Sequence, residues 1–296
     1  MSKNVLFVFN LQAGRGALKG KLAEILDCFI KADYRVEVYV SQHPGDLVEQ
    51  VKVLGADKDI VICSGGDGTL NEVVSAIMTM EKKPLLGYLP AGTTNDFGAN
   101  HKIPKDMIQA AKIAAGDRAR PIDIGSFNGD RYFAYVAGFG SFTNVPYRTP
   151  QELKAFFGHP AYLIEGAKDL VNLKPTHTWV TWEGETREME VLLALVSNAS
   201  QVAGFKNLGG EDVSLDDGIF ETLIIQNPEN PLQFTEIISA LLQGNECRFV
   251  CRIKSAEIEF RFEKPVEWVL DGEYGGEQTH VFIKNHQKSI CFLKKD

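Results

Sequence analysis

Two periodicities of apolar residues alternate along the first 120 positions of the chain. Short apolar runs with the character of buried strands lie at 4–10, 36–40, 59–63 and 85–90. Between them, apolar residues at helical spacing predict helices at 18–30, 47–54, 70–78 and 104–116. Strands that alternate with helices are typical of a parallel sheet covered on both faces. The pattern therefore predicts an α/β domain with a mostly parallel sheet over residues 1–124.

The pattern changes near residue 120, and most later segments alternate like strands. They lie at 131–137, 178–183, 188–197, 219–226, 248–253, 256–262 and 266–270. The sequences FNGD (127–130) and WEGE (182–185) predict hairpin turns, and helices are expected at roughly 150–172 and 231–243. We therefore expect a β-rich, sandwich-like second domain over 125–285, with the segment at about 286–296 returning to the first domain. A ligand-binding cleft is expected between the two domains.

Composition narrows the class of protein. The net charge is −8, and residues 1–120 hold 15 Lys and Arg against 14 Asp and Glu, which leaves 16 against 25 in the rest of the chain. Neither part is a basic surface for nucleic acid, so no nucleic-acid partner is expected. The 5 cysteines and 6 histidines show no metal-binding spacing. We expect the cysteines to be buried reduced thiols and the histidines to lie on the surface or in loops.

The apolar start, MSKNVLFVFN, is too short for a signal peptide. The sequence also contains no run of about 18 apolar residues, the length that a membrane-spanning helix needs. We therefore expect a cytoplasmic protein.

The stretch SGGDGTLNEVV (64–74) follows a predicted strand and opens a predicted helix. Glycines in that position let the backbone approach a phosphate closely, and the N–H groups at a helix start attract an anion. The stretch is not a Walker A loop, and its carboxylate, Asp67, suits a phosphate whose charge is bridged by Mg²⁺. The alternative is a tight turn in which Asp67 or Thr69 caps the helix.

Two further polar loops leave predicted strands. They are NLQAGRG (10–16) and LPAGTTNDFG (89–98), and the second is rich in N–H and hydroxyl donors. In a parallel sheet the loops that follow the strands meet at the carboxyl edge, where ligands bind. Three such loops predict a nucleotide site.

GGDGTLNEVV (65–74) together with PAGTTNDFG (90–98) resembles the catalytic domain of diacylglycerol kinases, within the bacterial lipid kinases. GGDGT alone is shared with NAD kinases and, more loosely, with phosphofructokinases, and the resemblance implies their fold for the first domain. The second motif selects the lipid kinases. PIDIG (121–125), LDDG (215–218) and LDGE (270–273) follow in the order expected for the family. The resemblance implies ATP and Mg²⁺ as cofactors and a lipid acceptor at the membrane surface.

The resemblance also implies which residues contact the nucleotide. They are Asn10, Gly14, Ser41, Gly65, Gly66, Asp67, Gly68, Thr69, Leu70, Asn71, Glu72, Thr93, Asn95 and Asp96. The first loop departs from the usual N-P-x-S-G of the family, because Leu11 and Ala13 replace proline and serine and remove a hydroxyl contact. As alternatives, Ser41 ends a strand, and Asn71 and Glu72 lie on a helix surface.

Two carboxylate sites in the second half are implied in the same way. A structural Mg²⁺ would be held by the Asp217 carboxylate and the backbone oxygens of Ser214 and Ile219, hard ligands that suit this cation. Asp271 would be the general base, supported by Glu273. The residues alone allow ordinary turns in both places. Asp67 and Asp123 are further metal candidates, with a structural hydrogen bond as the alternative for Asp123.

These features predict an ATP-dependent lipid kinase that converts diacylglycerol to phosphatidic acid, acting peripherally at the inner face of the membrane. The alternatives are an NAD kinase-like enzyme and a catalytically silent regulator that binds nucleotide or lipid. Candidate membrane-docking segments are KGK (19–21) and KAFFGHP (154–160). No residue set selects one lipid over another, and the sequence leaves a homodimer open.

Overall fold

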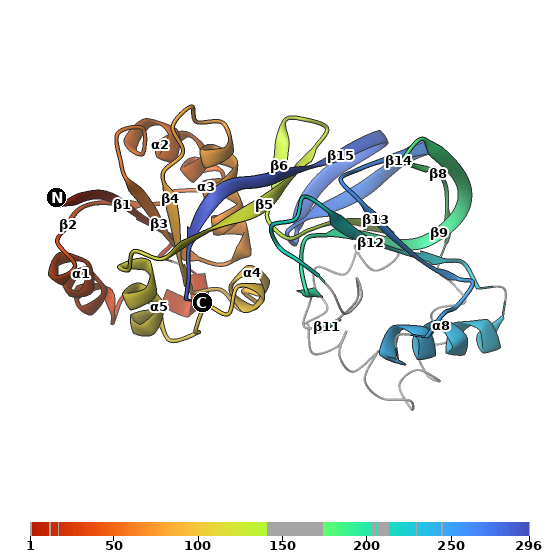
Figure 1. Ribbon diagram of the computed structural model, residues 1–296, viewed down its shortest axis with the longest axis horizontal. Helices are drawn as coiled ribbons and strands as arrows, with labels where there is room; N and C mark the ends of the chain where they lie inside the picture. Colours follow the sequence, from red (N-terminus) through yellow and green to blue (C-terminus); the bar gives the residue numbers. More distant parts are fainter. Residues whose placement is uncertain are drawn as a thin grey trace. The chain divides into compact units, whose positions relative to one another are not determined.

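The computed structural model describes residues 2–11, 13–16, 18–140, 174–202, 205–206, 213–228, 230–243 and 245–295. The chain divides into two compact units, and each is described by itself (Figure 1). Unit 1 comprises Met1–Ile124, Arg131–Ala134 and His286–Asp296, and unit 2 comprises Gly125–Asp130 and Tyr135–Asn285. The nucleotide-binding and lipid-binding roles of the two predicted domains stay predictions, as does the cleft.

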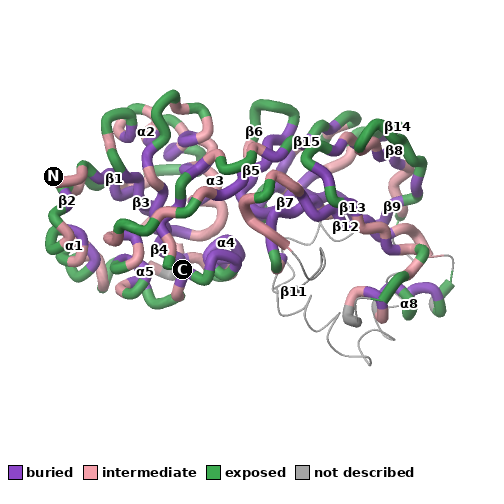
Figure 2. Tube along the Cα trace, in the orientation of Figure 1, coloured by how far each residue is buried: buried purple, intermediate pink, exposed green. Residues whose placement is uncertain are grey.

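Neighbouring parallel strands form the centre of unit 1, in the order β2, β1, β3, β4. At its C-terminal end β15 joins this group, because Phe292 pairs with Leu86 of β4 in parallel. Strand β3 is buried along its whole length (Figure 2), as expected for a strand with both faces covered. The strands are β1 (Lys3–Phe9), β2 (Tyr34–Val40), β3 (Ile60–Gly65), β4 (Leu85–Pro90) and β15 (Glu273–Leu293).

The helices of unit 1 confirm the predicted helical spacing, although several of their ends differ from the predicted bounds and one further helix is present. Helix α5 begins at Met107 and not at Pro104, because Asp106 accepts the N–H groups of Ile108 and Gln109 and caps the helix there. Helix α4 was not predicted, since five residues are too few to show a period. The helices are α1 (Leu22–Lys31), α2 (Asp46–Leu54), α3 (Asp67–Met78), α4 (Asp96–Asn100) and α5 (Met107–Ala114).

Antiparallel pairing dominates the strands that follow. They pair in the order β13, β12, β9, β7, β14, β15, and β8 pairs with both β9 and β14. Strand pairing over the described chain is therefore mixed, with an α/β part followed by a β-rich part. The strands are β5 (Ala119–Phe127), β6 (Arg131–Phe133), β7 (Val136–Gly140), β8 (Thr176–Trp182), β9 (Glu185–Ser197), β10 (Gln201–Val202), β11 (Phe205–Lys206), β12 (Phe220–Gln226), β13 (Val250–Ser255) and β14 (Glu257–Leu270).

The hairpins confirm the two predicted turns and reveal a third of the same kind. Asn128–Gly129 and Glu183–Gly184 each have positive φ at both residues, the requirement of a two-residue type I′ turn. Asp271–Gly272 between β14 and β15 shares this property. Two expected strands, 256–262 and 266–270, form the single strand β14, and the 131–137 segment forms both β6 and β7.

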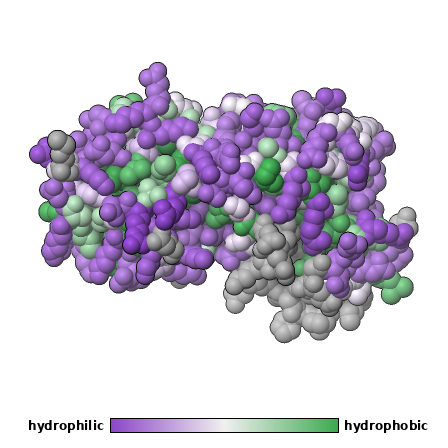
Figure 3. Space-filling view, viewed as in Figure 1, coloured by the Kyte–Doolittle hydropathy of each residue, from purple (hydrophilic) through white to green (hydrophobic). Residues whose placement is uncertain are grey.

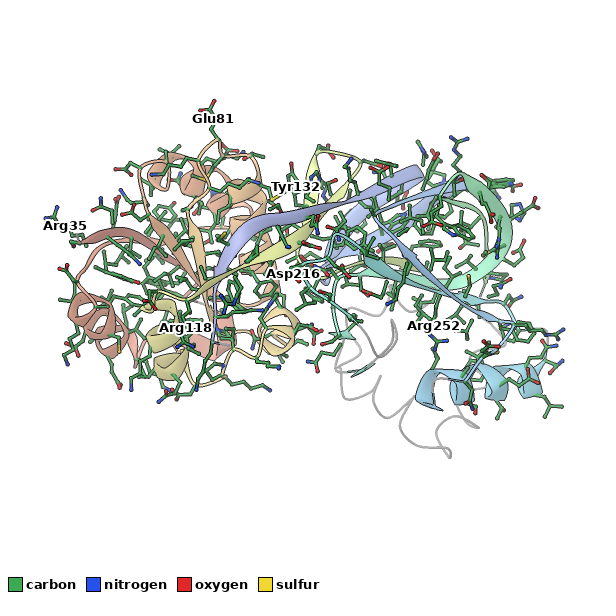
Figure 4. All side chains as sticks on the ribbon, in the orientation of Figure 1. Arg35, Glu81, Arg118, Tyr132, Asp216 and Arg252 are labelled. Atoms are coloured by element: carbon green, nitrogen blue, oxygen red, sulfur yellow. The ribbon has the colours of Figure 1, made fainter. Side chains whose placement is uncertain are left out.

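Helix α8 (Pro231–Gln243) confirms the helix expected at 231–243. Its buried residues Ile237 and Ala240 pack on apolar side chains of β9, β12 and β13. Arg252 of β13, labelled in Figure 4, donates to the carbonyl of Ala240 at 3.3 Å. The helix expected at 150–172 and the segment KAFFGHP lie outside the described residues.

Hydrophilic residues cover most of the face shown in Figure 3. Among the residues described, no helix has the length and apolar character to cross a membrane. His101 lies in the turn after α4, which agrees with the expected loop position, but its ring is buried against Phe97 and Phe292 and is not on the surface. Burial lowers the pKa of His101 to about 3, so this ring is neutral. The expectation of buried cysteines holds for Cys63, whereas Cys291 is exposed.

Candidate functional site

The structure brings together the loops that follow β1, β2, β3 and β4 in unit 1. The N–H of Asn10 donates to the carbonyl of Ser64 at 3.2 Å, and that of Ser41 donates to Phe9 at 2.9 Å. The N–H of Ala91 donates to Gly65 at 2.8 Å. The loops thus extend the pairing of their parallel strands, and their polar groups gather at one edge of the sheet.

Two glycines form the contact between the loop after β3 and the loop after β4. A Cβ atom on Gly92 would lie 2.5 Å from the Cα of Gly66, and one on Gly66 would lie 3.3 Å from the Cα of Gly92. Gly65 is constrained in a different way, since its Cβ would lie 2.4 Å from that of Thr69. Backbone therefore packs on backbone here, and side chains are excluded from the contact.

Asp67 ties these loops together through the start of α4. Its Oδ2 accepts the N–H of Asp96 at 3.1 Å, and its Oδ1 accepts the N–H of Phe97 at 3.2 Å. The structure differs from the expected alternative in detail, because the N-cap of α3 is Gly66, which makes no side-chain cap, and Asp67 caps the next helix, α4. Burial raises the pKa of Asp67, and the N–H groups of Phe97 and Asp96 partly offset that rise.

Asn95 shapes the second loop from within. It has a φ of 55°, and it exchanges two hydrogen bonds with Gly92: the Gly92 N–H donates to Oδ1 at 2.8 Å, and Nδ2 donates to the Gly92 carbonyl at 2.7 Å. The hydroxyl of Tyr88 donates to the carbonyl of Gly65 at 3.0 Å, so a buried tyrosine supports both loops from below. Thr93 is exposed at the tip of the loop, and Asp96 is buried.

Glu72 and Asn71 make structural contacts within unit 1. The two carboxylate oxygens of Glu72 accept the N–H groups of Gly45 at 2.8 Å and Leu47 at 3.1 Å, which caps the start of α2. Asn71 donates to the carbonyl of Tyr132 (labelled in Figure 4) at 2.9 Å. These contacts favour the structural alternative for both residues.

The remaining nucleotide candidates differ in what they can offer a ligand. Gly68 and Leu70 lie in the first turns of α3, where the Leu70 side chain is buried in the core and its N–H donates to the carbonyl of Gly66 at 3.1 Å. Gly14 lies in the 3-10 helix Ala13–Gly16. The hydroxyl of Ser41 donates to the carbonyl of His43 at 3.3 Å, which is the contact expected of a residue that ends a strand.

Asp123, a metal candidate from the sequence, is buried in the middle of β5. Its Oδ1 accepts the N–H of Lys288 at 2.7 Å, and Lys288 has a φ of 52°. The carboxylate thus stabilises an irregular position in β15. This contact favours the structural alternative for Asp123.

In unit 2, the candidate base Asp271 is the first residue of the β14–β15 hairpin turn. Its side chain is 3% exposed, and its Oδ1 accepts the N–H groups of Tyr135 at 3.0 Å and Val136 at 3.1 Å. The turn therefore holds the carboxylate in one orientation. Glu273 is exposed and opens β15 opposite Leu270. Sequence reasoning missed the two N–H donors, since they lie just before and at the start of β7, 136 and 135 residues earlier.

The candidate cation loop of unit 2 leads into β12. Asp217 is exposed, and its Oδ1 accepts the N–H of Ile219 at 3.0 Å. The hydroxyl of Ser214 donates to Oδ1 of Asp216 (labelled in Figure 4) at 3.0 Å. Over the described ranges, no group of three or more His, Cys, Asp or Glu side chains is arranged to hold a metal. The loop contains carboxylate and carbonyl oxygens, the ligand types that a hard cation prefers. The buried carboxylate of Glu221 follows it in β12, and its oxygens have no hydrogen-bond partner among the described residues.

Comparison with known proteins assigns the family. A family model for the diacylglycerol kinase catalytic domain matches residues 4–127. The diacylglycerol kinase of Bacillus subtilis is 34% identical over 298 residues, covering 99% of this chain and 97% of the relative. That of Staphylococcus carnosus is 33% identical over 301 residues, covering 100% and 97%.

Solved structures show the same fold. A crystal structure of a diacylglycerol kinase from Bacillus anthracis has a TM-score of 0.77 at 20% identity, covering 99% of this chain and 97% of the other. A second crystal structure from that organism has a TM-score of 0.83 at 23% identity with the same coverage. The full-length match to the curated relatives shows that the chain belongs to the diacylglycerol kinase family.

Proposed function

We propose that the chain is an ATP-dependent lipid kinase that transfers the γ-phosphoryl group of ATP to the hydroxyl of diacylglycerol, giving phosphatidic acid. The observation that carries this proposal is the contact between Gly66 and Gly92. It holds two loops rich in N–H groups backbone to backbone at one sheet edge. Such a surface suits phosphate groups, because N–H dipoles are already oriented before the anion arrives.

Unit 1 would hold the nucleotide mainly through its backbone. The N–H groups of Gly65 to Thr69 and the start of the second loop, with exposed Thr93, would contact the phosphates, and Asn10 to Gly14 with Ser41 would border the site. Mg²⁺, when bound, would neutralise charge on the transferring phosphoryl group. Asp67 holds the second loop in place, and its remaining lone pairs leave it able to interact with that cation.

Asp271 would accept the proton of the acceptor hydroxyl, with Glu273 beside it in the same hairpin. Two N–H groups fix one carboxylate oxygen of Asp271, so the orientation of the other is set before substrate binds. Phosphoryl transfer depends mostly on positioning and charge neutralisation, and a fixed carboxylate supplies positioning for the hydroxyl.

The proposal also includes the type of each domain, the place where the enzyme acts and its oligomeric state. We infer an NAD kinase and phosphofructokinase-like first domain and a sandwich-like lipid domain. The acceptor lies in a bilayer, so the enzyme would act peripherally at the inner face of the membrane. A homodimer stays a prediction.

A panel of acceptors tests the proposal. Labelled ATP is incubated with dispersed diacylglycerol, a sphingoid base, phosphatidylglycerol, a polyprenol and NAD, and the labelled products are separated. We expect transfer to diacylglycerol. Transfer to NAD alone would identify an NAD kinase, and ATP binding without transfer to any acceptor would identify a silent regulator.

A further inference from the structure

Glu221 is a buried carboxylate that the reaction outlined above does not use. It is the second residue of β12, a strand with neighbours on both sides, and its side chain is 2% exposed. Neither carboxylate oxygen has a hydrogen-bond partner among the described residues. A buried carboxylate in that condition needs a proton or a cation, because desolvation of an unpaired charge is costly.

Lys254 does not fill this need well. It lies opposite Glu221 in the register of β12 and β13, but its Nζ is 3.7 Å from the nearer carboxylate oxygen, which is longer than a hydrogen bond. The Lys254 side chain is also 55% exposed, so water competes for its charge.

The candidate cation loop lies over the same end of β12. Ser197 of β9 is directly opposite Glu221, and the next residue, Asn198, donates to the carbonyl of Leu215 in the loop at 3.5 Å. The N–H of Ile219 donates to Oδ1 of Asp217 at 3.0 Å, and Ile219 precedes Glu221 by only two residues, so the loop leads directly into the start of β12. Two carboxylates and loop carbonyls therefore gather at one place in unit 2.

We propose that Glu221 is a second carboxylate ligand of the Mg²⁺ assigned to the Ser214–Ile219 loop. The inference rests on the proposed function, since the family resemblance implies a structural Mg²⁺ in this loop, and it adds a residue to that site. A cation there would give the buried oxygens of Glu221 a partner and would balance the charge of Asp217. Carbonyl oxygens of the loop and water would complete the coordination.

The test measures Mg²⁺ binding to the full chain without nucleotide. Titration calorimetry compares wild type with Glu221→Gln and with Glu257→Gln, a control in which an exposed carboxylate paired to Lys284 at 2.7 Å is neutralised. We expect Glu221→Gln to weaken Mg²⁺ binding at least about tenfold and Glu257→Gln to leave it unchanged. Glu221→Asp, a milder change, should give an intermediate affinity. Far-ultraviolet circular dichroism checks that each variant is folded.

Thermal unfolding with Mg²⁺ and with a chelator gives an independent readout. We expect Mg²⁺ to raise the unfolding temperature of wild type and of Glu257→Gln but not that of Glu221→Gln. Equal Mg²⁺ affinity in wild type and Glu221→Gln, or no Mg²⁺ binding by wild type, would overturn the inference. The acceptor panel separates the two proposals. If Glu221→Gln loses Mg²⁺ binding but the wild type phosphorylates no lipid, the kinase assignment fails and the assignment of Glu221 as a ligand stands.

Discussion

Replacing Gly92 by alanine would disturb the contact between the loop after β3 and the loop after β4, the two loops proposed to bind phosphate. The added Cβ would lie 2.5 Å from the Cα of Gly66 and 2.9 Å from Oδ1 of Asn95. Ordinary carbon–carbon contact begins near about 3.5 Å, so the loops would have to separate by roughly 1 Å. The obstructing atom on Gly66 is backbone, and no rotamer change can relieve the clash.

The cost can be worked out from these contacts. Overpacking of this kind costs about 1–3 kcal/mol, and loss of the hydrogen bond from the Gly92 N–H to Asn95 adds about 0.5–1.5 kcal/mol. We therefore expect Gly92→Ala to lower the free energy of unfolding by about 2–4 kcal/mol. For a unit of this size that corresponds to a fall of about 5–15 °C in the unfolding temperature.

Thermal unfolding and titration with ATP measure the two consequences. Gly20→Ala is the matched control, because a Cβ on Gly20 meets no atom within 4 Å. We expect Gly92→Ala to unfold earlier and to bind ATP at least about tenfold more weakly, since displaced N–H groups no longer converge on the phosphates. Unfolding and ATP affinity equal to those of Gly20→Ala would refute the claim that these loops pack backbone to backbone.

Three further outcomes follow from single contacts. Asp271→Asn keeps an oxygen for the N–H groups of Tyr135 and Val136, so we expect unchanged thermal stability with turnover reduced about 10²-fold or more; near-wild-type turnover would contradict its role as base. Glu72→Gln removes charge and one acceptor at the start of α2, so chemical denaturation should show a loss of about 1 kcal/mol while the ATP affinity is kept. The pKa of His177 is raised, first because of its hydrogen bond to Glu190. Protonated His177 should therefore stabilise the β8–β9 pairing fully below about pH 6.5, and this stabilisation should be lost as the pH rises through the pKa of His177 in the folded protein. A nuclear magnetic resonance titration checks this, and a His177 pKa at or below that of a model peptide would contradict it.

The elements that sequence predicts well are those fixed by local chemistry. The hairpin at Asn128–Gly129 follows from a dipeptide that tolerates positive φ at both positions, and α8 follows from the spacing of its apolar residues. Strand β15 was missed for the opposite reason. Its 21 residues contain Gly275 and Gly276 at a register shift and a run of mostly polar residues at 284–289, so no period-2 signal runs through the whole strand.

For the candidate site, the sequence does not predict the role of each side chain. A carboxylate that caps a distant helix and one that faces a ligand have the same local sequence. Glu72 lies next to the glycine motif but accepts N–H groups from residues 27 and 25 positions earlier, and Asp67 accepts them from residues 29 and 30 positions later. Only the tertiary fold decides which amides each carboxylate meets, so the motif indicates where the loops lie without assigning every side chain in it.

The distinction between side chains that position a loop and backbone groups that would contact a ligand also applies to the unusual first loop, residues 10–16. The side chains of Asp67, Asn95 and Tyr88 position neighbouring backbone. In the proposed site, backbone N–H groups would bind the phosphates. The first loop is held in the same manner, because Asn10 donates from its backbone to Ser64, and Ala13 donates from its backbone to Asn10 at 3.2 Å. Neither bond needs the proline or serine that the family usually carries. Leu11 and Ala13 therefore remove a hydroxyl contact without removing the bonds that place the loop, and we expect the nucleotide site to keep its backbone donors.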